Sequence, residues 1–252
     1  FREMEDHETD LLRNDILEAM AEDRDKPLVD ALARHFTGAE IATLLKEITG
    51  QLDAFPAPTD TKTLSAALGV AADLSVCDLS ATRFDGNDKA LLRRWIDILE
   101  QGGSTEAKAA KRLAGISPGE AFDTADLEIM ESIFLFGPGS KTAHAAKIDA
   151  FPTKGTRAAN PDLSEALNDL MQRVEDTRNA RLRCVVRDRT MVLHRFAETF
   201  GARYTADKQR RGVLDFDDLI HKTRALLTDP AVAQWVLFRL DGGVDHILVD
   251  EA

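Results

Sequence analysis

Cysteine, tyrosine and long apolar runs are all scarce in this sequence of 252 residues. The two cysteines, Cys77 and Cys184, are too few for a disulfide framework or a four-ligand zinc site, and the six histidines show no spacing such as HExxH. No apolar run reaches the roughly 18 residues of a membrane helix, and the acidic first ten residues do not form a signal peptide. We therefore expect a soluble, cytoplasmic protein with no structural metal and no membrane partner.

Residues that favour strands are also few. β-Branched runs are scarce, whereas alanine, leucine and charged residues are abundant, and this composition favours helices over sheets. With 44% apolar residues, a chain of this length can bury a sizeable core. We expect a mainly α protein with at least half of its residues in helices.

Apolar residues recur at helical spacing along most of the chain. The pattern predicts helices near 11–20, 27–36, 39–48, 89–100, 105–113, 124–136, 161–210, 215–227 and 230–241, and a short helix near 143–148. Asp215 can cap the helix 215–227 through Asp218, three residues on. Segments 52–62, 80–87 and 137–161 have the composition of loops. A continuous apolar run, His246 to Val249, is the one segment that fits a buried strand.

The net charge of −12 argues against a polyanionic partner, because proteins bind nucleic acid largely through cations. The charge is unevenly distributed, however. Residues 1–25 contain ten acidic and three basic residues, whereas residues 171–211 contain eleven basic and five acidic residues. A DNA-facing surface is therefore compatible with the composition.

The basic residues of segment 171–211 lie in the longest predicted helix, which begins at Pro161. A helical wheel places three arginines on its solvent side and three on or beside its apolar stripe. The first three are candidate DNA contacts or, alternatively, part of an ordinary solvated face: Arg173, Arg183 and Arg187. The other three should form ion pairs with acidic residues of neighbouring helices, because an unpaired buried charge is costly: Arg178, Arg181 and Arg189.

The apolar run that ends at Val249 is followed by Asp250 and Glu251. In open α/β sheets, ligands bind at the carboxyl ends of the strands, and a strand that ends in Asp-Glu is the Walker B arrangement. Asp250 can then reach a nucleotide-bound Mg²⁺, and Glu251 can orient or deprotonate the attacking water. The pattern by itself is more typical of a buried strand that leads into an acidic loop.

A second segment, Phe136-Gly-Pro-Gly-Ser-Lys-Thr142, has some features of a phosphate-binding loop. The Walker A pattern requires glycine directly before the lysine, and Ser140 occupies that position. The segment also follows a predicted helix and not a strand. We interpret it as a surface loop, so the sequence contains no Walker A motif.

Two segments near the end of the chain resemble the approach to motif II of the UvrD, PcrA, RecB and AddA helicases of superfamily 1. The first is Arg211-Gly-Val-Leu-Asp-Phe-Asp-Asp-Leu-Ile220, and the second, about thirty residues later, is Asp245-His-Ile-Leu-Val-Asp-Glu-Ala252. The intervening Trp235-Val-Leu-Phe-Arg-Leu-Asp-Gly-Gly-Val244 looks closest to AddA of the alphaproteobacterial type. The opening, Phe1-Arg-Glu-Met-Glu-Asp6, is similar to the chain after motif Ic.

This resemblance implies an internal segment of a longer helicase. Residues 1–211 would form the helical insertion called subdomain 1B, and residues 212–252 would return into the RecA-like P-loop α/β domain (1A) and end in one strand. Glu251 would be the catalytic carboxylate and Asp250 the Mg²⁺ ligand.

For the whole protein, the resemblance implies an ATP-dependent DNA helicase and exonuclease subunit that acts in double-strand-break repair and recombination. Its cofactors would be ATP and Mg²⁺, and its partners single-stranded DNA, duplex DNA and an AddB-like subunit. Without Walker A, we expect the segment alone to bind no cofactor and to be inactive as an ATPase.

Two other readings stay open. In the first, the helical part is a non-catalytic interaction module that packs on a partner subunit, which the acidic first 25 residues favour and the arginine-rich helix opposes. In the second, the chain is an all-helical scaffold in which the terminal Asp-Glu is accidental, and this requires the similarities at both ends of the chain to arise by chance.

Overall fold

The structure, a computed structural model, describes residues 1–52, 55, 59–117, 121–229 and five single positions beyond them: 232, 234, 235, 238 and 239. Of the described part, 73% is helical and the strands amount to two short segments. The mainly α class and the predicted helix content of at least one half are therefore confirmed. None of the helices in this part is both long and apolar enough to cross a membrane.

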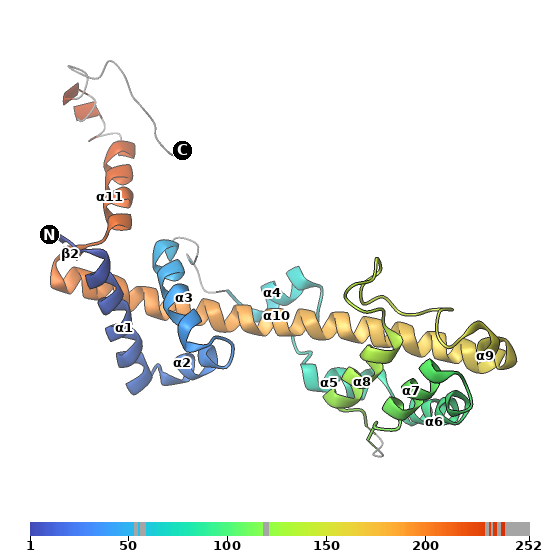
Figure 1. The fold of residues 1–252 in the computed structure, drawn as a ribbon. Helices are drawn as coiled ribbons and strands as arrows, with labels where there is room; N and C mark the ends of the chain where they lie inside the picture. The colour runs from blue at the N-terminus through green and yellow to red at the C-terminus, as the bar shows by residue number, and fades with distance from the viewer. Residues whose placement is uncertain are drawn as a thin grey trace. The chain divides into compact units, whose positions relative to one another are not determined.

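The elements follow one another as shown in Figure 1. They are β1 (Arg2–Glu3), α1 (Asp6–Glu22), α2 (Lys26–Ala33), α3 (Gly38–Gly50), α4 (Thr61–Leu68), α5 (Val76–Arg83), α6 (Gly86–Glu100), α7 (Ser104–Leu113), α8 (Thr124–Phe134), α9 (Lys154–Ala159), α10 (Pro161–Arg211), β2 (Val213–Leu214) and α11 (Phe216–Thr228). The chain divides into two compact units, residues 1–58 with 192–252 and residues 59–191. Helix α10 contributes residues to both.

The first unit is built on residues 192–211 of α10, against which α1, α2 and α3 pack (Figure 1). Three aromatic residues spaced four apart on α10 lie one above the other in its core, with ring centroids 5.5 Å apart between Phe196 and Phe200 and 6.4 Å apart between Phe200 and Tyr204. All three are fully buried. Residues four apart share one face of a helix, so this spacing gives α10 a continuous aromatic face for the three shorter helices.

The second unit has its own core, formed by α6, α7, α8 and residues 161–191 of α10. Trp95 of α6 lies at its centre, fully buried, and its indole N–H donates to the carbonyl oxygen of Leu163 at 3.3 Å. Asp85 and Asp123 begin α6 and α8 as N-caps, each in a capping box with the aspartate three residues on. These local signals explain why the predicted helices 89–100 and 124–136 form nearly where the sequence placed them.

The described strands lie where no strand was predicted. β1 and β2 form a two-stranded parallel pair in which Arg2 is opposite Val213 and Glu3 is opposite Leu214. Each strand has only two residues, too few to show an alternating pattern in the sequence. The predicted strand at 246–249 and the predicted helix at 230–241 lie outside the continuously described residues.

Several local predictions were wrong. The segment 143–148 is not a helix, because it folds back in turns that place Ala146 opposite Leu135 in an antiparallel bridge. Helices α4, α5 and α9 were missed. Each is only six to eight residues long, a length at which packing decides helix formation more than local sequence does.

The buried core of the second unit gives a direct stability prediction. Leu99→Ala, which removes a fully buried side chain, should lower the free energy of unfolding by about 2–5 kcal/mol. Leu182→Ala, at a position 38% exposed on α10, should cost about 0.5 kcal/mol or less. Urea unfolding followed by tryptophan fluorescence measures both changes, and equal costs would contradict the assigned core.

Candidate nucleic-acid interface

The predicted catalytic pair, Asp250 and Glu251, lies outside the described residues, and its role stays a prediction. Within the described part of the chain, no cluster of three or more His, Cys, Asp or Glu side chains is arranged to hold a metal ion. The described residues of the second unit include basic side chains on its surface, and these form the candidate site.

Two of the three arginines predicted to form ion pairs do so. Arg178 and Arg181 both contact Glu131 of α8, with closest N–O distances of 3.7 and 2.9 Å. Both side chains are largely buried, so a shared carboxylate partner offsets part of the cost of burying them. The prediction was wrong for Arg189, which is exposed and has no ion pair with any carboxylate in the described ranges.

Arg173, predicted as solvent-facing, is only partly exposed. Its guanidinium donates to both carboxylate oxygens of Asp88, at 2.5 and 2.8 Å, and to the carbonyl oxygen of Arg83 at 2.9 Å. The hydrogen bonds to Asp88 raise the pKa of Arg173 above its ordinary value. This guanidinium therefore ties α10 to the start of α6.

The prediction that Arg187 lies on the solvent side was wrong. Arg187 is 5% exposed, and its guanidinium donates to the carbonyl oxygen of Ala71 at 3.1 Å and to Asp188 at 2.8 Å. The helical wheel assumed one apolar stripe along the whole helix, but the turn after α4 covers a different face here. Cys184, one turn before Arg187, is buried against the same turn. Of the three candidate DNA contacts, Arg183 alone is exposed and has no ion pair with a carboxylate of the described residues.

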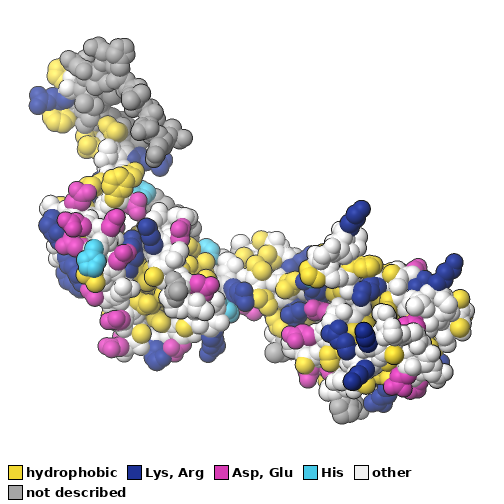
Figure 2. Space-filling view, in the orientation of Figure 1, with side chains coloured by type: hydrophobic (Ala, Val, Ile, Leu, Met, Phe, Trp, Pro, Cys, Tyr) yellow, Lys and Arg dark blue, Asp and Glu magenta, His cyan; other side chains and the backbone are white. Residues whose placement is uncertain are grey.

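A group of basic residues that the sequence reasoning missed lies on α7. Lys108, Lys111 and Arg112 are exposed, and none has an ion pair with a carboxylate in the ranges that the structure describes. Their spacing of three and four residues puts them on neighbouring positions of one helix surface, a signal that was present in the sequence. Figure 2 shows Lys and Arg side chains gathered over the area where α7 and α8 lie in Figure 1.

Lys147 extends this group from the loop after α8. Its ammonium donates to the carbonyl oxygen of Ile133 at 2.6 Å. Partial burial lowers the pKa of Lys147, and the nearby positive charge of Arg112 lowers it further. Two like charges close together favour an anion between them, which would relieve their repulsion. We call Lys108, Lys111, Arg112 and Lys147 the α7 basic cluster.

The acidic excess of the chain belongs mainly to the other unit. Residues 59–191 contain 18 Lys and Arg against 20 Asp and Glu, whereas the remaining residues contain 14 against 24. The second unit is therefore close to neutral, and its exposed basic surface is not cancelled by a large net negative charge.

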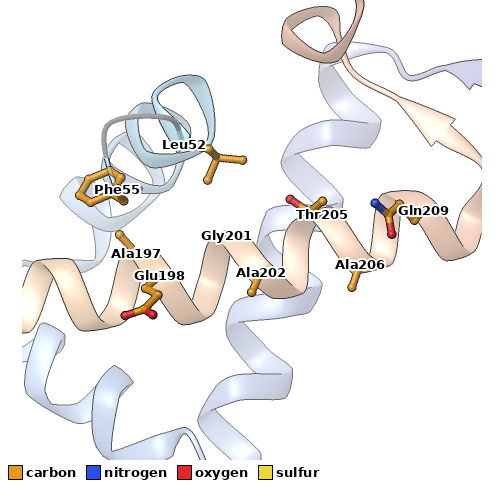
Figure 3. Close-up of a pocket in the computed structure, with 9 residues that line it drawn as sticks. All are labelled: Leu52, Phe55, Ala197, Glu198, Gly201, Ala202, Thr205, Ala206 and Gln209. Carbon is orange, nitrogen blue, oxygen red and sulfur yellow. The ribbon is translucent and has the colours of Figure 1, made fainter. Parts of the chain in front are cut away.

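A shallow groove in the first unit does not suit a nucleotide. Figure 3 shows this groove, which has a volume of about 350 Å³, between α10 and the segment after α3. Small and apolar side chains such as Leu52 and Gly201 form most of its described lining, and Glu198 is the one charged group. A surface that presents a carboxylate and no cation repels phosphate groups.

The end of α10 and the start of α11 meet in a buried polar network. The Asp215 carboxylate accepts hydrogen bonds from Tyr204 Oη at 2.7 Å and Lys208 Nζ at 2.6 Å, and it caps α11 by accepting from the Asp218 amide at 2.8 Å. The predicted capping box of Asp215 and Asp218 is thereby confirmed. Burial opposes ionisation of Asp215, but the hydrogen bonds from Lys208, the Asp218 amide and Tyr204 outweigh it and lower its pKa.

Comparison with protein families decides the class of the chain. The model of the UvrD/REP helicase N-terminal domain matches residues 16–252, which is nearly the whole chain. The chain belongs to the UvrD/REP helicase family. This membership confirms the expected UvrD-like superfamily 1 helicase and implies DNA binding. Comparisons with curated proteins and with solved structures returned no match.

The network at Asp215 of this helicase chain gives a prediction with a pH signature. Asp215→Asn keeps a side chain that can cap α11 but leaves the buried Lys208 with Asp218 as its one remaining carboxylate partner, so it should cost up to about 3 kcal/mol at pH 7. Asp10→Asn, which removes a 65% exposed partner of Arg13, should cost at most about 1 kcal/mol.

The pH dependence follows from the lowered pKa of Asp215. A carboxylate with a lowered folded pKa stabilises the fold fully above its unfolded pKa, about 3.9 for aspartate, and the stabilisation is lost as pH falls through the folded pKa. The difference between wild type and Asp215→Asn should therefore stay constant above about pH 5 and shrink below about pH 4. Urea unfolding followed by circular dichroism across this range measures it, and a difference independent of pH would refute the ionised network.

Proposed function

We propose that this chain is part of an AddA-type, ATP-dependent DNA helicase and exonuclease subunit that acts with an AddB-like partner in double-strand-break repair and recombination. The family match carries the helicase assignment. The resemblance of segments 211–220 and 235–252 to AddA supports the finer assignment.

In this proposal residues 1–211 are the helical subdomain 1B and residues 212–252 return into the RecA-like domain. The pairing of β1 with β2 supports this division. An inserted domain requires its incoming and outgoing segments to lie side by side, and here Arg2 is opposite Val213. The hydrogen bonds from Arg2 N to Gly212 O (3.0 Å) and from Met4 N to Leu214 O (2.8 Å) hold the two segments together.

The proposed chemistry assigns one role to each carboxylate of the Asp-Glu pair. Carboxylate oxygens are the ligands that Mg²⁺ prefers, so Asp250 would bind the metal of a Mg²⁺–ATP complex. Glu251 would orient the attacking water and accept its proton. Bound ATP supplies the free energy that drives movement along single-stranded DNA.

The α7 basic cluster and Arg183 are the surface that we assign to the phosphates of duplex DNA. These side chains are exposed or partly exposed and have no carboxylate partner within the described ranges. Arg173 and Arg187, in contrast, already have intramolecular partners. DNA contact by Arg173 would require its bond to Asp88 to be exchanged for a bond to a phosphate.

An interaction module that packs on a partner subunit is the second candidate function. It is favoured by the acidic surface of the first unit, where the solvent side of α1 carries Asp15, Glu18 and Glu22. In that case the chain would bind a partner protein and have no salt-dependent affinity for DNA.

DNA binding by the chain itself separates the two candidates. The double variant Lys111→Gln, Arg112→Gln should weaken binding of duplex DNA and reduce the slope of log affinity against log salt by about 1–2, since each lost phosphate contact contributes about 0.9. The matched control is Arg24→Gln, Lys26→Gln, which removes the same charge near α2, where both bases contact aspartates.

Fluorescence anisotropy at several salt concentrations measures these slopes. If the two double variants weaken binding equally, the α7 basic cluster is not the DNA surface. If the unaltered chain has no salt-dependent affinity, the interaction module is the better assignment.

The catalytic proposal is tested at Glu251 in the full-length helicase. Glu251→Gln should keep nucleotide affinity but lower DNA-stimulated ATP turnover by about 10²- to 10⁴-fold, because an amide keeps the size of the side chain but cannot act as a base. Asp250→Asn should in addition weaken the dependence on Mg²⁺. Turnover close to that of the wild type in Glu251→Gln would show that the Walker B assignment is wrong.

A further inference from the structure

The Asp215 carboxylate connects three consecutive elements of the first unit. It accepts hydrogen bonds from Tyr204 and Lys208 of α10, it directly follows β2, and it caps the first turn of α11. The direction in which the chain leaves α10 therefore depends on this group.

Lys208 is held as tightly as Asp215. Its ammonium is 2.6 Å from carboxylate oxygens of both Asp215 and Asp218, and it lies 4.5 Å from the centre of the Tyr204 ring. Lys208 is 4% exposed and Asp215 7%. A buried ammonium between two carboxylates and an aromatic ring has few alternative arrangements, because each one would leave a charge without a partner.

The pairing of β1 with β2 also holds the connection between α10 and α11. Gly212 adopts a positive φ of 64°, which ends α10 and turns the chain into β2. The backbone bonds from Arg2 and Met4 to the carbonyl oxygens of Gly212 and Leu214 then fix residues 212–214. The short connection between α10 and α11, residues 212–215, is therefore held by both side-chain and backbone hydrogen bonds.

We propose that the contact between Lys208 and Asp215 is a coupling joint, which transmits displacement of α10 to the segment that leads to Asp250 and Glu251. This inference rests on the proposed function. Helix α10 supplies residues to the unit that contains the α7 basic cluster and also to the joint. Binding of DNA that displaces α10 would thereby change the position of α11, and Lys208 and Asp215 would act through α11 without contacting ATP or DNA.

The test compares two variants that each remove one positive charge from the last turn of α10. Lys208→Met breaks the joint and keeps the length of the side chain. Arg210→Met is the matched control, because Arg210 is 72% exposed and contacts only Asp207 in the described part of the chain. Circular dichroism of both variants checks that the helices still form.

The first readout is amide hydrogen exchange of the chain. In Lys208→Met, the amides of residues 213–220 should exchange at least about 5-fold faster, while those of α1, α6 and α7 keep their rates. Arg210→Met should match the wild type. Equal exchange at 213–220 in all three proteins would overturn the joint itself.

The second readout is ATP hydrolysis by the full-length helicase. Lys208→Met should reduce the stimulation of kcat by DNA at least about 5-fold, the lower end of typical coupling between two sites. The rate without DNA, the KM for ATP and the affinity for DNA should stay unchanged, and Lys208→Arg should restore most of the stimulation. A purely structural role would instead lower the rates with and without DNA together.

Each failure has a different meaning. If the wild type shows no DNA-stimulated hydrolysis, the proposed function is wrong. If the wild type is stimulated and Lys208→Met is stimulated equally, the coupling joint is wrong.

Should Lys208→Met not fold, Tyr204→Phe removes one hydrogen bond to Asp215 and keeps the buried ring. Stimulation equal to that of the wild type in this variant, with faster exchange at 213–220, would also overturn the coupling.

Discussion

Both hydrophobic cores depend on the packing of one helix, α10. Its residues 161–191 supply Leu167, Leu170 and Val174 to one core, and its residues 192–211 supply Phe196 and Phe200 to the other. The shorter helices have only a few turns each and gain most of their stability by packing. The two units therefore share a scaffold whose aliphatic half and aromatic half select different sets of neighbours.

Packing against α10 also determines which of its arginine side chains can contact a ligand. Arg178, Arg181 and Arg187 have intramolecular partners because the helices and turns that cover α10 bring carboxylates and carbonyl oxygens to them. The bases of α7 are exposed, and none of them has an ion pair with an acidic side chain of the described residues. Burial and local hydrogen-bond partners determine which arginines can contact a ligand. The number of basic residues in a segment does not determine this.

The connection from α10 to α11 uses a different principle. Here a buried charge pair lies beside the apolar side chains of Tyr204 and Val213, and breaking such a pair costs more than forming it gains. The pair therefore adds little net stability, but other arrangements of this segment would leave a buried charge without a partner. In the proposed coupling joint, this pair would pass a displacement of α10 to the segment that leads to Asp250 and Glu251.

The sequence alone determined the helical class, the start of α10 at Pro161 and the cap at Asp215, because caps and apolar spacing act over a few residues. It also determined the family, because the segments 211–220 and 245–252 are distinctive. Tertiary structure alone decided the burial of Arg187, the pairing of β1 with β2 and the meeting of Lys147 with Arg112. Each of these joins residues or faces that are far apart along the chain. A helical wheel or a local pattern contains no information about which distant segment covers a given face.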